Sequence, residues 1–252
     1  MKGTVLITGA SSGFGAAAAR RFADEGWRLV LCARRYERLE TMRDELGGEQ
    51  VVHIIQLDVR DREAVMERLG SLPAPFDEVD VLINNAGLGL GLEPAWDANL
   101  DDWETMVDTN IKGLMYTTRA VLPGMVSRNR GHVIDLGSIA GNWPYPGGNV
   151  YGATKAFVQQ FSRNLRADLV GTRVRVTNIE PGLCETEFSV VRFKGDQAKA
   201  DSLYEGKDPI EPQDLAEIMH WVVSLPARVN INSVEVMPIT QTWGKLPVQP
   251  VR

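Results

Sequence analysis

Short runs of apolar residues alternate along this chain with longer stretches in which apolar and polar positions recur at helical spacing. The apolar runs are nearly continuous, which is typical of strands that are buried on both faces of a parallel sheet. They predict strands at residues 4–7, 28–33, 51–57, 79–83, 132–136, 173–179 and 233–237.

The amphipathic stretches between these runs predict helices at residues 14–25, 37–46, 63–69, 101–126, 150–170 and 212–225. Strands that alternate with helices indicate a parallel sheet with helices on both faces. The sequence shows no linker rich in Pro, Gly and Ser and no internal repeat. We therefore expect one doubly wound α/β domain of the Rossmann type over residues 1–252, with a substrate lid at 185–210.

Composition narrows the classes of function. The chain has 252 residues, is 44% hydrophobic and carries a net charge of -6, which argues against a nucleic-acid partner. It has no apolar run long enough to span a membrane, and it enters its first strand where a signal peptide would lie. Two cysteines, Cys32 and Cys184, are too few for a disulfide framework. We expect a cytoplasmic protein, and the three scattered histidines predict no metal site.

A glycine-rich turn joins the first predicted strand to the first predicted helix. Its spacing is G-x-x-x-G-x-G, and bare backbone at a helix N-terminus lets a pyrophosphate approach free N–H groups. The alternative is a plain tight turn. The turn supplies the candidate cofactor residues Gly9, Ser11, Ser12, Gly13, Phe14 and Gly15.

The end of the second strand indicates which cofactor is bound. An acidic residue there would hold the ribose 2′-hydroxyl of NAD. This chain has Arg34 and Arg35 instead, and the first carboxylate after them is Glu37. Guanidinium groups pair with a 2′-phosphate, so the sequence favours NADP. Alternatively, the two arginines only begin a solvated helix.

Residues after the third and fourth strands reach the same edge of the sheet. Asp58 and Val59 are expected to border the adenine, and Asn84, Ala86 and Gly87 end the fourth strand where ligands of such folds bind.

Tyr151 and Lys155 follow Ser138 by thirteen and seventeen positions. A free tyrosine titrates near pH 10, and a cation on the same helix face, four residues away, would lower that pKa. Ser138 would donate a hydrogen bond to the substrate oxygen on which charge develops. The pair could instead be a surface helix pair. With the glycine turn upstream, the pattern predicts a nucleotide-dependent oxidoreductase with Tyr151 as acid/base.

These motifs, in this order, resemble those of the short-chain dehydrogenase/reductase family over essentially the whole chain. Within that family, residues 102–113, 142–158 and 175–196 are similar to the bacterial NADP-dependent 3-hydroxy acid dehydrogenases, which act on serine and allo-threonine. The resemblance implies a Rossmann fold, NADP(H) as cofactor and a homotetramer that pairs the two long helices.

The resemblance also implies roles for single residues. Tyr151 would be the acid/base and Lys155 its partner, both also touching the cofactor, while Ser138 orients the substrate. Asn110 would hold a water near Lys155. Thr186, five residues past Pro181, would contact the nicotinamide carboxamide, and Pro181 and Gly182 would belong to the cofactor site.

The substrate pocket is less determined by the sequence. Asn142 and Tyr145 lie between Ser138 and Tyr151, so we expect them in one wall. The lid carries Arg192 and Lys194, and a small acid needs a cation to hold its carboxylate. We expect Arg192 or Lys194 in that role; the alternative is a solvated charge.

Five functions are considered at this point. The favoured one is interconversion of a small 3-hydroxy acid (3-hydroxypropionate, serine or allo-threonine) and its oxo or semialdehyde form. A sulfoacetaldehyde reductase that forms isethionate would differ only in the anion held. The extended epimerases and dehydratases are a third alternative, but they have a substrate domain that this chain lacks. Another carbonyl reductase is a fourth. A non-catalytic nucleotide-sensing module is the alternative from a different class.

Overall fold

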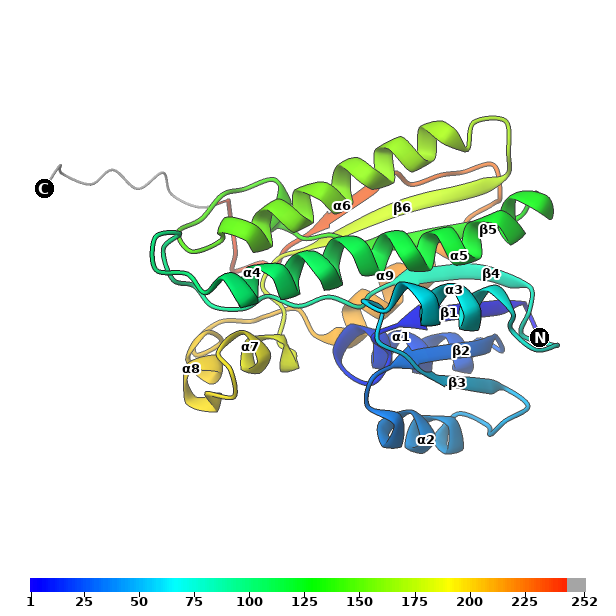
Figure 1. Ribbon diagram of the computed structural model, residues 1–252, viewed down its shortest axis with the longest axis horizontal. Coiled ribbons are helices and arrows are strands. Elements are labelled where there is room, and N and C mark those ends of the chain that lie inside the picture. The colour runs from blue at the N-terminus through cyan, green and yellow to red at the C-terminus, as the bar shows by residue number, and fades with distance from the viewer. Residues whose placement is uncertain (244–252) are drawn as a thin grey trace, which may run out of the picture.

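The computed structural model describes residues 1–243, so residues 244–252 of the predicted domain lie outside the described residues. Within residues 1–243, one parallel sheet has the strand order β3-β2-β1-β4-β5-β6-β7 (Figure 1). This confirms the predicted Rossmann-type α/β fold. The strands are β1 (Thr4–Thr8), β2 (Arg28–Ala33), β3 (Val52–Gln56), β4 (Val79–Asn84), β5 (Gly131–Leu136), β6 (Val174–Pro181) and β7 (Ser233–Val236).

Helices cover both faces of the sheet, as the alternating pattern predicts (Figure 1). The described helices are α1 (Gly13–Asp24), α2 (Tyr36–Glu45), α3 (Arg62–Gly70), α4 (Leu100–Val107), α5 (Leu114–Ser127), α6 (Asn149–Asp168), α7 (Glu187–Arg192), α8 (Gln197–Ser202) and α9 (Pro212–Ser224).

Successive strand residues point to opposite faces and fill two separate cores. On β1, Val5 and Ile7 join the core beneath α1, α2 and α9, whereas Leu6 joins the core beneath α3, α5 and α6. All three side chains are fully buried. Burial on both faces explains why the strands read as continuous apolar runs.

The helical region predicted at 101–126 is interrupted in the structure. Between α4 and α5 lies one wide turn of π-helix, η1 (Asp108–Gly113), in which the backbone remains helical at both ends. A Cβ atom on Gly113 would lie only 2.6 Å from Val59 Cγ2, so the helix packs closely against the loop after β3. A π-helical turn of this kind is frequent at functional sites.

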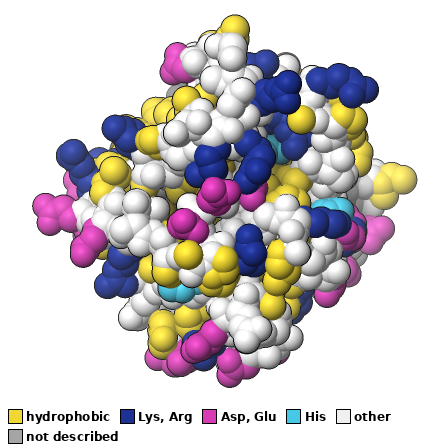
Figure 2. Space-filling view, turned by 90° about the vertical axis from the view of Figure 1, so that its right-hand side faces the viewer, with side chains coloured by type: hydrophobic (Ala, Val, Ile, Leu, Met, Phe, Trp, Pro, Cys, Tyr) yellow, Lys and Arg dark blue, Asp and Glu magenta, His cyan; other side chains and the backbone are white. Residues whose placement is uncertain are grey.

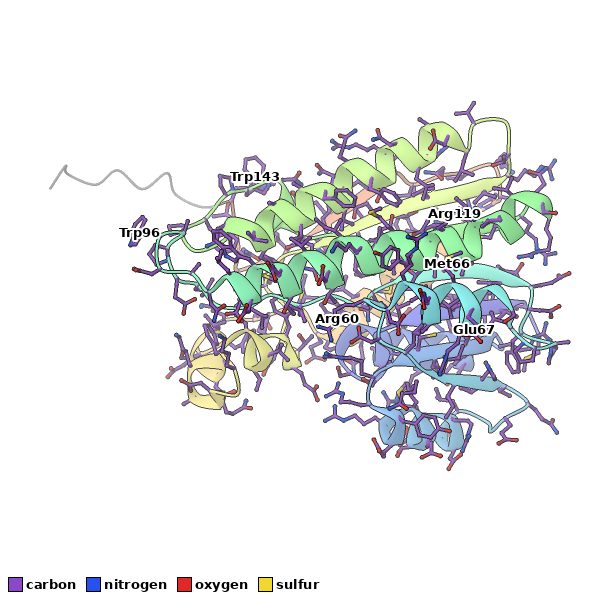
Figure 3. All side chains as sticks on the ribbon, in the orientation of Figure 1. Arg60, Met66, Glu67, Trp96, Arg119 and Trp143 are labelled. Carbon is purple, nitrogen blue, oxygen red and sulfur yellow. The ribbon has the colours of Figure 1, made fainter. Side chains whose placement is uncertain are left out.

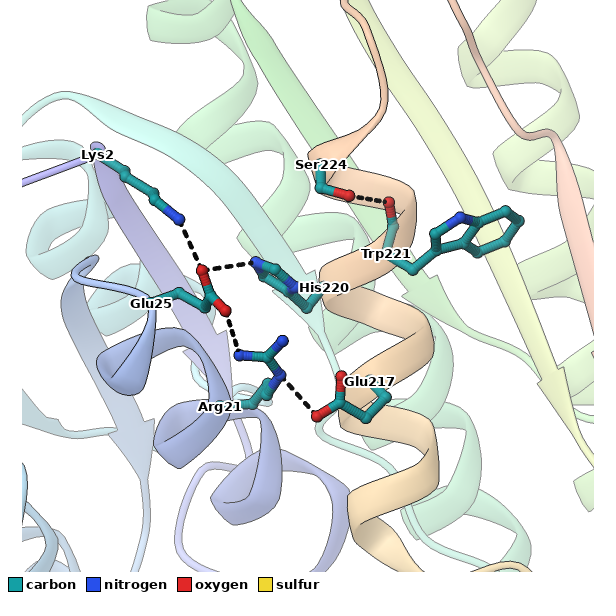
Figure 4. A network of polar contacts seen from close by, with 7 residues as sticks. All are labelled: Lys2, Arg21, Glu25, Glu217, His220, Trp221 and Ser224. Atoms are coloured by element: carbon teal, nitrogen blue, oxygen red, sulfur yellow. Dashed lines mark hydrogen bonds and ion pairs between the residues drawn. The ribbon is translucent and has the colours of Figure 1, made fainter.

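The α1 and α9 helices are joined at their outer edge by a polar network (Figure 4). Glu25 Oε2 accepts from Lys2 Nζ at 2.7 Å, and Glu25 Oε1 accepts from Arg21 Nη1 at 2.6 Å. Arg21 Nε lies 2.7 Å from Glu217 of α9. These cations lower the pKa of Glu25 to about 2, with the hydrogen bond from Lys2 as the largest cause.

The surface at the amino ends of the strands carries interspersed acidic, basic and apolar side chains (Figure 2). At the opposite end, Trp96 and Trp143 project from loops (Figure 3). Trp143 Nε1 donates to Glu235 at 3.2 Å, Trp243 Nε1 donates to the same carboxylate at 3.1 Å, and the two rings lie 6.0 Å apart. Among the described residues, no helix is long and apolar enough to cross a membrane.

Candidate active site

The strand order reverses between β1 and β4, and the carboxyl ends of the strands border a cleft at that point. Ligands of open α/β sheets bind at this position. The cleft has a cavity volume of about 330 Å³. It brings together most of the predicted site residues: Gly9, Ser11, Ser12, Gly13, Phe14, Arg34, Arg35, Asp58, Val59, Ala86, Gly87, Ser138, Tyr151, Lys155, Pro181, Gly182 and Thr186.

The glycine turn after β1 forms one wall of the cleft. Gly9 and Gly13 have φ values of 65° and 52°, a conformation that favours glycine. A Cβ atom on Gly15 would lie 2.5 Å from Gly9 O and 2.6 Å from Asn85 Nδ2, so Gly15 packs behind the turn. The side chain of Ser12, the N-cap residue of α1, makes no capping hydrogen bond. The uncapped N-terminus of α1 suits a pyrophosphate.

Arginine side chains lie at the adenosine end of the cleft. Arg35 donates from Nε to Ser11 Oγ at 3.2 Å and from Nη2 to Ser12 Oγ at 2.7 Å. Its Nη1 and the Nη1 of Arg38 both reach the carboxylate of Glu187, at 2.9 and 2.7 Å. The described residues at this end therefore fit the 2′-phosphate of NADP(H).

Asp58 lines the cleft and forms an ion pair with Arg60, with 2.6 Å between Asp58 Oδ2 and Arg60 Nη2. The hydrogen bonds from Arg60 hold the pKa of Asp58 below its usual range. The carboxylate is thus ionised and fixed at the position predicted for the adenine border.

The side chain of Asn84 points away from the cleft, although we expected it in the cofactor site. Its Nδ2 donates to Thr118 Oγ1 and to Asp135 Oδ1, both at 2.9 Å, in the core. Asn85 lines the cleft instead, and its Nδ2 donates to Gly9 O at 3.1 Å. Because adjacent strand residues face opposite sides, a one-residue difference moves the amide from the site to the core.

Tyr151 and Lys155 enter the cleft from the first turns of α6. Lys155 Nζ donates to Leu136 O at 2.7 Å and lies 5.9 Å from the centroid of the Tyr151 ring. Ser138 follows β5 and caps the short helix η2 (Ile139–Gly141), with Ala140 N donating to Ser138 Oγ at 3.1 Å. Three of the four predicted catalytic side chains, those of Ser138, Tyr151 and Lys155, therefore line one cleft.

Burial opposes ionisation of both groups. It raises the pKa of Tyr151 to about 12, against the lowering effects of the Arg192 charge and the Ser138 hydroxyl. It lowers the pKa of Lys155 to about 8, against the raising effect of Asp135. The charge of Arg192 is the larger of the two effects that lower the pKa of Tyr151, and the lowering expected from Lys155 stays a prediction.

Asn110 lies in the π-helical turn and is buried. Leu88 N donates to Asn110 Oδ1 at 2.9 Å, and Asn110 Nδ2 donates to Leu88 O at 2.8 Å. A Cβ atom on Gly87 would lie 3.3 Å from Asn110 Oδ1 and 3.6 Å from Lys155 Nζ, so both groups approach this backbone. The predicted water between Asn110 and Lys155 stays a prediction.

Of the two lid cations, Arg192 lies against two residues that line the cleft, Tyr151 and Phe188. Its guanidinium carbon lies 4.8 Å from the ring centroids of both Tyr151 and Phe188, and its Nη2 donates to Tyr145 Oη at 3.4 Å. The buried Nε of Arg192 has no hydrogen-bond partner in the described part of the chain. Lys194 instead pairs with Asp102, with 2.8 Å between Nζ and Oδ2.

The side-chain amide of Asn142, which we expected in the substrate wall, forms hydrogen bonds with neighbouring polar side chains. Its Nδ2 donates to Glu180 Oε2 at 2.8 Å, and its Oδ1 accepts from Gln159 Nε2. Among the wall residues, Tyr145 is the one that reaches Arg192.

Comparison with known proteins agrees with this geometry. A family model described as "short chain dehydrogenase" matches residues 3–197. The chain belongs to the short-chain dehydrogenase family. It is 61% identical to "NADP-dependent 3-hydroxy acid dehydrogenase YdfG" of Salmonella typhi over 97% of this chain and 98% of that protein. It is 54% identical to "Sulfoacetaldehyde reductase 2" of Chromohalobacter salexigens over 98% and 99%.

A solved structure, "The Closed form of serine dehydrogenase complexed with NADP+", is similar throughout, with a TM-score of 0.96 and 58% identity. The match covers 98% of this chain and 100% of that one. The family assignment therefore rests on both sequence and fold.

Sequence reasoning did not include several residues of this short-chain dehydrogenase in the site. Arg38 and Glu187 meet across the cleft from α2 and α7. The Phe188 ring packs at a tilt of 56° against that of Tyr151, with ring centroids 5.5 Å apart. Glu187 and Phe188 follow Thr186, the N-cap residue of α7. Thr186 Oγ1 accepts a hydrogen bond from Phe188 N. The N-cap residue Thr186 was a signal for this helix in the segment that we expected only as a polar lid.

Proposed function

We propose that this protein is an NADP(H)-dependent dehydrogenase that interconverts a small 3-hydroxy acid and its oxo or semialdehyde form. Substrates of the 3-hydroxypropionate, serine and allo-threonine type fit the proposal. The observation that carries it is the position of Arg192, whose guanidinium lies 4.8 Å from the Tyr151 ring. A cation beside the acid/base group suits a substrate whose anion is a few bonds from the reacting carbon.

The nicotinamide, when bound, supplies hydride transfer, and the protein positions and polarises the substrate. In this proposal Tyr151 holds or releases the proton at the substrate oxygen, and Ser138 donates a hydrogen bond to the same oxygen. Lys155, one turn further along α6, and Asn110, in the π-helical turn η1, support Tyr151. Tyr151 must lose its proton to act as a base, so Arg192 and Ser138, which act against the rise in its pKa caused by burial, assist oxidation.

NADP(H) is favoured over NAD(H) by the charges after β2. Arg34 and Arg35 line the cleft, and Arg38 joins Arg35 at the carboxylate of Glu187. The names of the 61% identical dehydrogenase and the solved serine dehydrogenase both include this cofactor. Activity with NADH alone would contradict the role of these arginines.

Sulfoacetaldehyde reduction is the second candidate, because a guanidinium binds a sulfonate as readily as a carboxylate and one relative at 54% identity has that name. We would follow the absorbance of NADPH and NADH separately with malonic semialdehyde and sulfoacetaldehyde. The reverse reaction would be run with 3-hydroxypropionate, serine and L-allo-threonine. NADPH-linked turnover of the carboxylates, with sulfoacetaldehyde poor, is expected. Preference for sulfoacetaldehyde would establish the second candidate, and no turnover would favour a nucleotide-sensing module.

Assembly as a cytoplasmic homotetramer through α5 and α6 is part of the proposal. Val158 and Leu165 of α6 are buried within the chain itself. Met115 and Val126 of α5 keep 39% and 40% of their surface exposed and provide apolar area for a partner. Light scattering after size-exclusion chromatography would give the mass; a monomer would refute this part.

A further inference from the structure

Glu187 brings a negative charge to the positive end of the cleft. Its two carboxylate oxygens pair with Arg38 Nη1 at 2.7 Å and Arg35 Nη1 at 2.9 Å. It is the first residue of α7, which belongs to the lid, whereas the arginines belong to the loop after β2 and to α2. The two ion pairs therefore join the lid to the opposite side of the cofactor cleft.

The same guanidinium groups are those that fit a 2′-phosphate. Arg35 is held against the glycine turn by Ser11 and Ser12, which leaves the Nη1 atoms of Arg35 and Arg38 to the carboxylate. A phosphate is a stronger partner because it has more charge and more acceptor oxygens. It would also repel a carboxylate that stayed in place.

We infer that Glu187 is a displaceable latch, which holds α7 on Arg35 and Arg38 until the 2′-phosphate of the cofactor takes its place. This inference rests on the proposed use of NADP(H). The latch makes the lid sensitive to the part of the cofactor that distinguishes NADP from NAD.

The same helix connects the latch to the reacting end of the cleft. Arg192 is the last residue of α7, five positions after Glu187, which is about 7.5 Å along a helix axis. The guanidinium of Arg192 contacts the Tyr151 ring. Release of Glu187 thus frees the helix that carries the proposed substrate clamp, and 2′-phosphate binding is coupled to the position of that clamp.

The test compares Glu187→Gln with the wild-type protein by calorimetric titration of 2′,5′-ADP and 5′-AMP, which differ only in the 2′-phosphate. The matched control is Glu185→Gln, which removes the same charge from an exposed lid residue with no ion pair among residues 1–243. Glu187→Gln should bind 2′,5′-ADP about three- to tenfold more tightly, because surface pairs are worth little singly and two are removed. Affinity for 5′-AMP should not change, nor should either affinity in Glu185→Gln.

Hydrogen exchange gives a second readout that needs no ligand. Amides of residues 187–192 should exchange faster in Glu187→Gln than in the wild type, and in the wild type 2′,5′-ADP should speed them while 5′-AMP does not. Unchanged or weaker binding of 2′,5′-ADP by Glu187→Gln would overturn the latch. If the wild-type protein binds the two nucleotides equally, the NADP(H) assignment itself fails, and the latch with it.

Discussion

Replacing Arg192 by Met should separate anionic from neutral substrates. Methionine keeps the apolar contact with Phe188, whose ring lies 4.8 Å from the guanidinium carbon, and removes the charge. A hydrogen bond from a charged donor contributes about 1.5–3 kcal/mol. At 1.4 kcal/mol for each factor of ten, kcat/KM for a 3-hydroxy acid should fall about 10- to 150-fold.

The assay is oxidation of 3-hydroxypropionate and of its neutral amide, with the ratio of their kcat/KM values as the readout. The ratio is needed because loss of the Arg192 charge also raises the pKa of Tyr151 further, which slows both substrates at neutral pH. Only the clamp distinguishes acid from amide. Lys194→Met is the control, since its charge is already paired with Asp102.

An acid-to-amide ratio that Arg192→Met leaves unchanged would refute the clamp. A fall of equal size in Lys194→Met would show that the ratio reports the general charge of the lid. In either case the position of Arg192 beside Tyr151 would need another explanation.

Three further predictions concern catalysis and stability. Tyr151→Phe should lower kcat by at least about 10²- to 10⁴-fold and leave 2′,5′-ADP affinity unchanged; substantial residual turnover would exclude Tyr151 as the acid/base. Asn110→Ala leaves both backbone groups of Leu88 without their partner, so urea unfolding should show a loss of about 1–3 kcal/mol, and an unchanged midpoint would contradict this. The folded-state pKa of Glu25 is about 2, below its ordinary value of 4.5, so its stabilisation is present above pH 4.5 and is lost toward pH 2. The melting temperature of Glu25→Gln should therefore lie below that of the wild type at pH 7 and approach it at pH 3.

The fold could be predicted because its signal is repeated in every strand. The apolar runs at 28–33 and 132–136 lie within a residue of β2 and β5 in the structure. The proposed catalytic residues Tyr151 and Lys155 could be predicted for a similar reason, since they share one helix face and their spacing is local. The sequence therefore predicts the strands and helices of the fold, and those site residues whose relative position is determined within a single helix or strand.

Relations between distant segments could not be predicted. Whether Asn84 or Asn85 faces the cleft depends on which residue ends β4, and element ends are poorly marked in sequence. The contact of Arg38 with Glu187 joins residues 149 positions apart. Asn110, in the π-helical turn, forms hydrogen bonds with Leu88, on a different segment of chain. Each of these features is tertiary, and helical or strand periodicity does not encode it.

The two indole rings that share Glu235 give the chain an internal optical reporter. Trp143 stands next to Asn142 in the proposed pocket wall, whereas Trp243 lies close to the end of the described chain, and both donate to one carboxylate on β7. If either ring shifts, its hydrogen bond to Glu235 breaks or the other ring moves with it. Tryptophan emission should therefore register displacement of the wall, so occupancy of the pocket becomes measurable in the unlabelled protein.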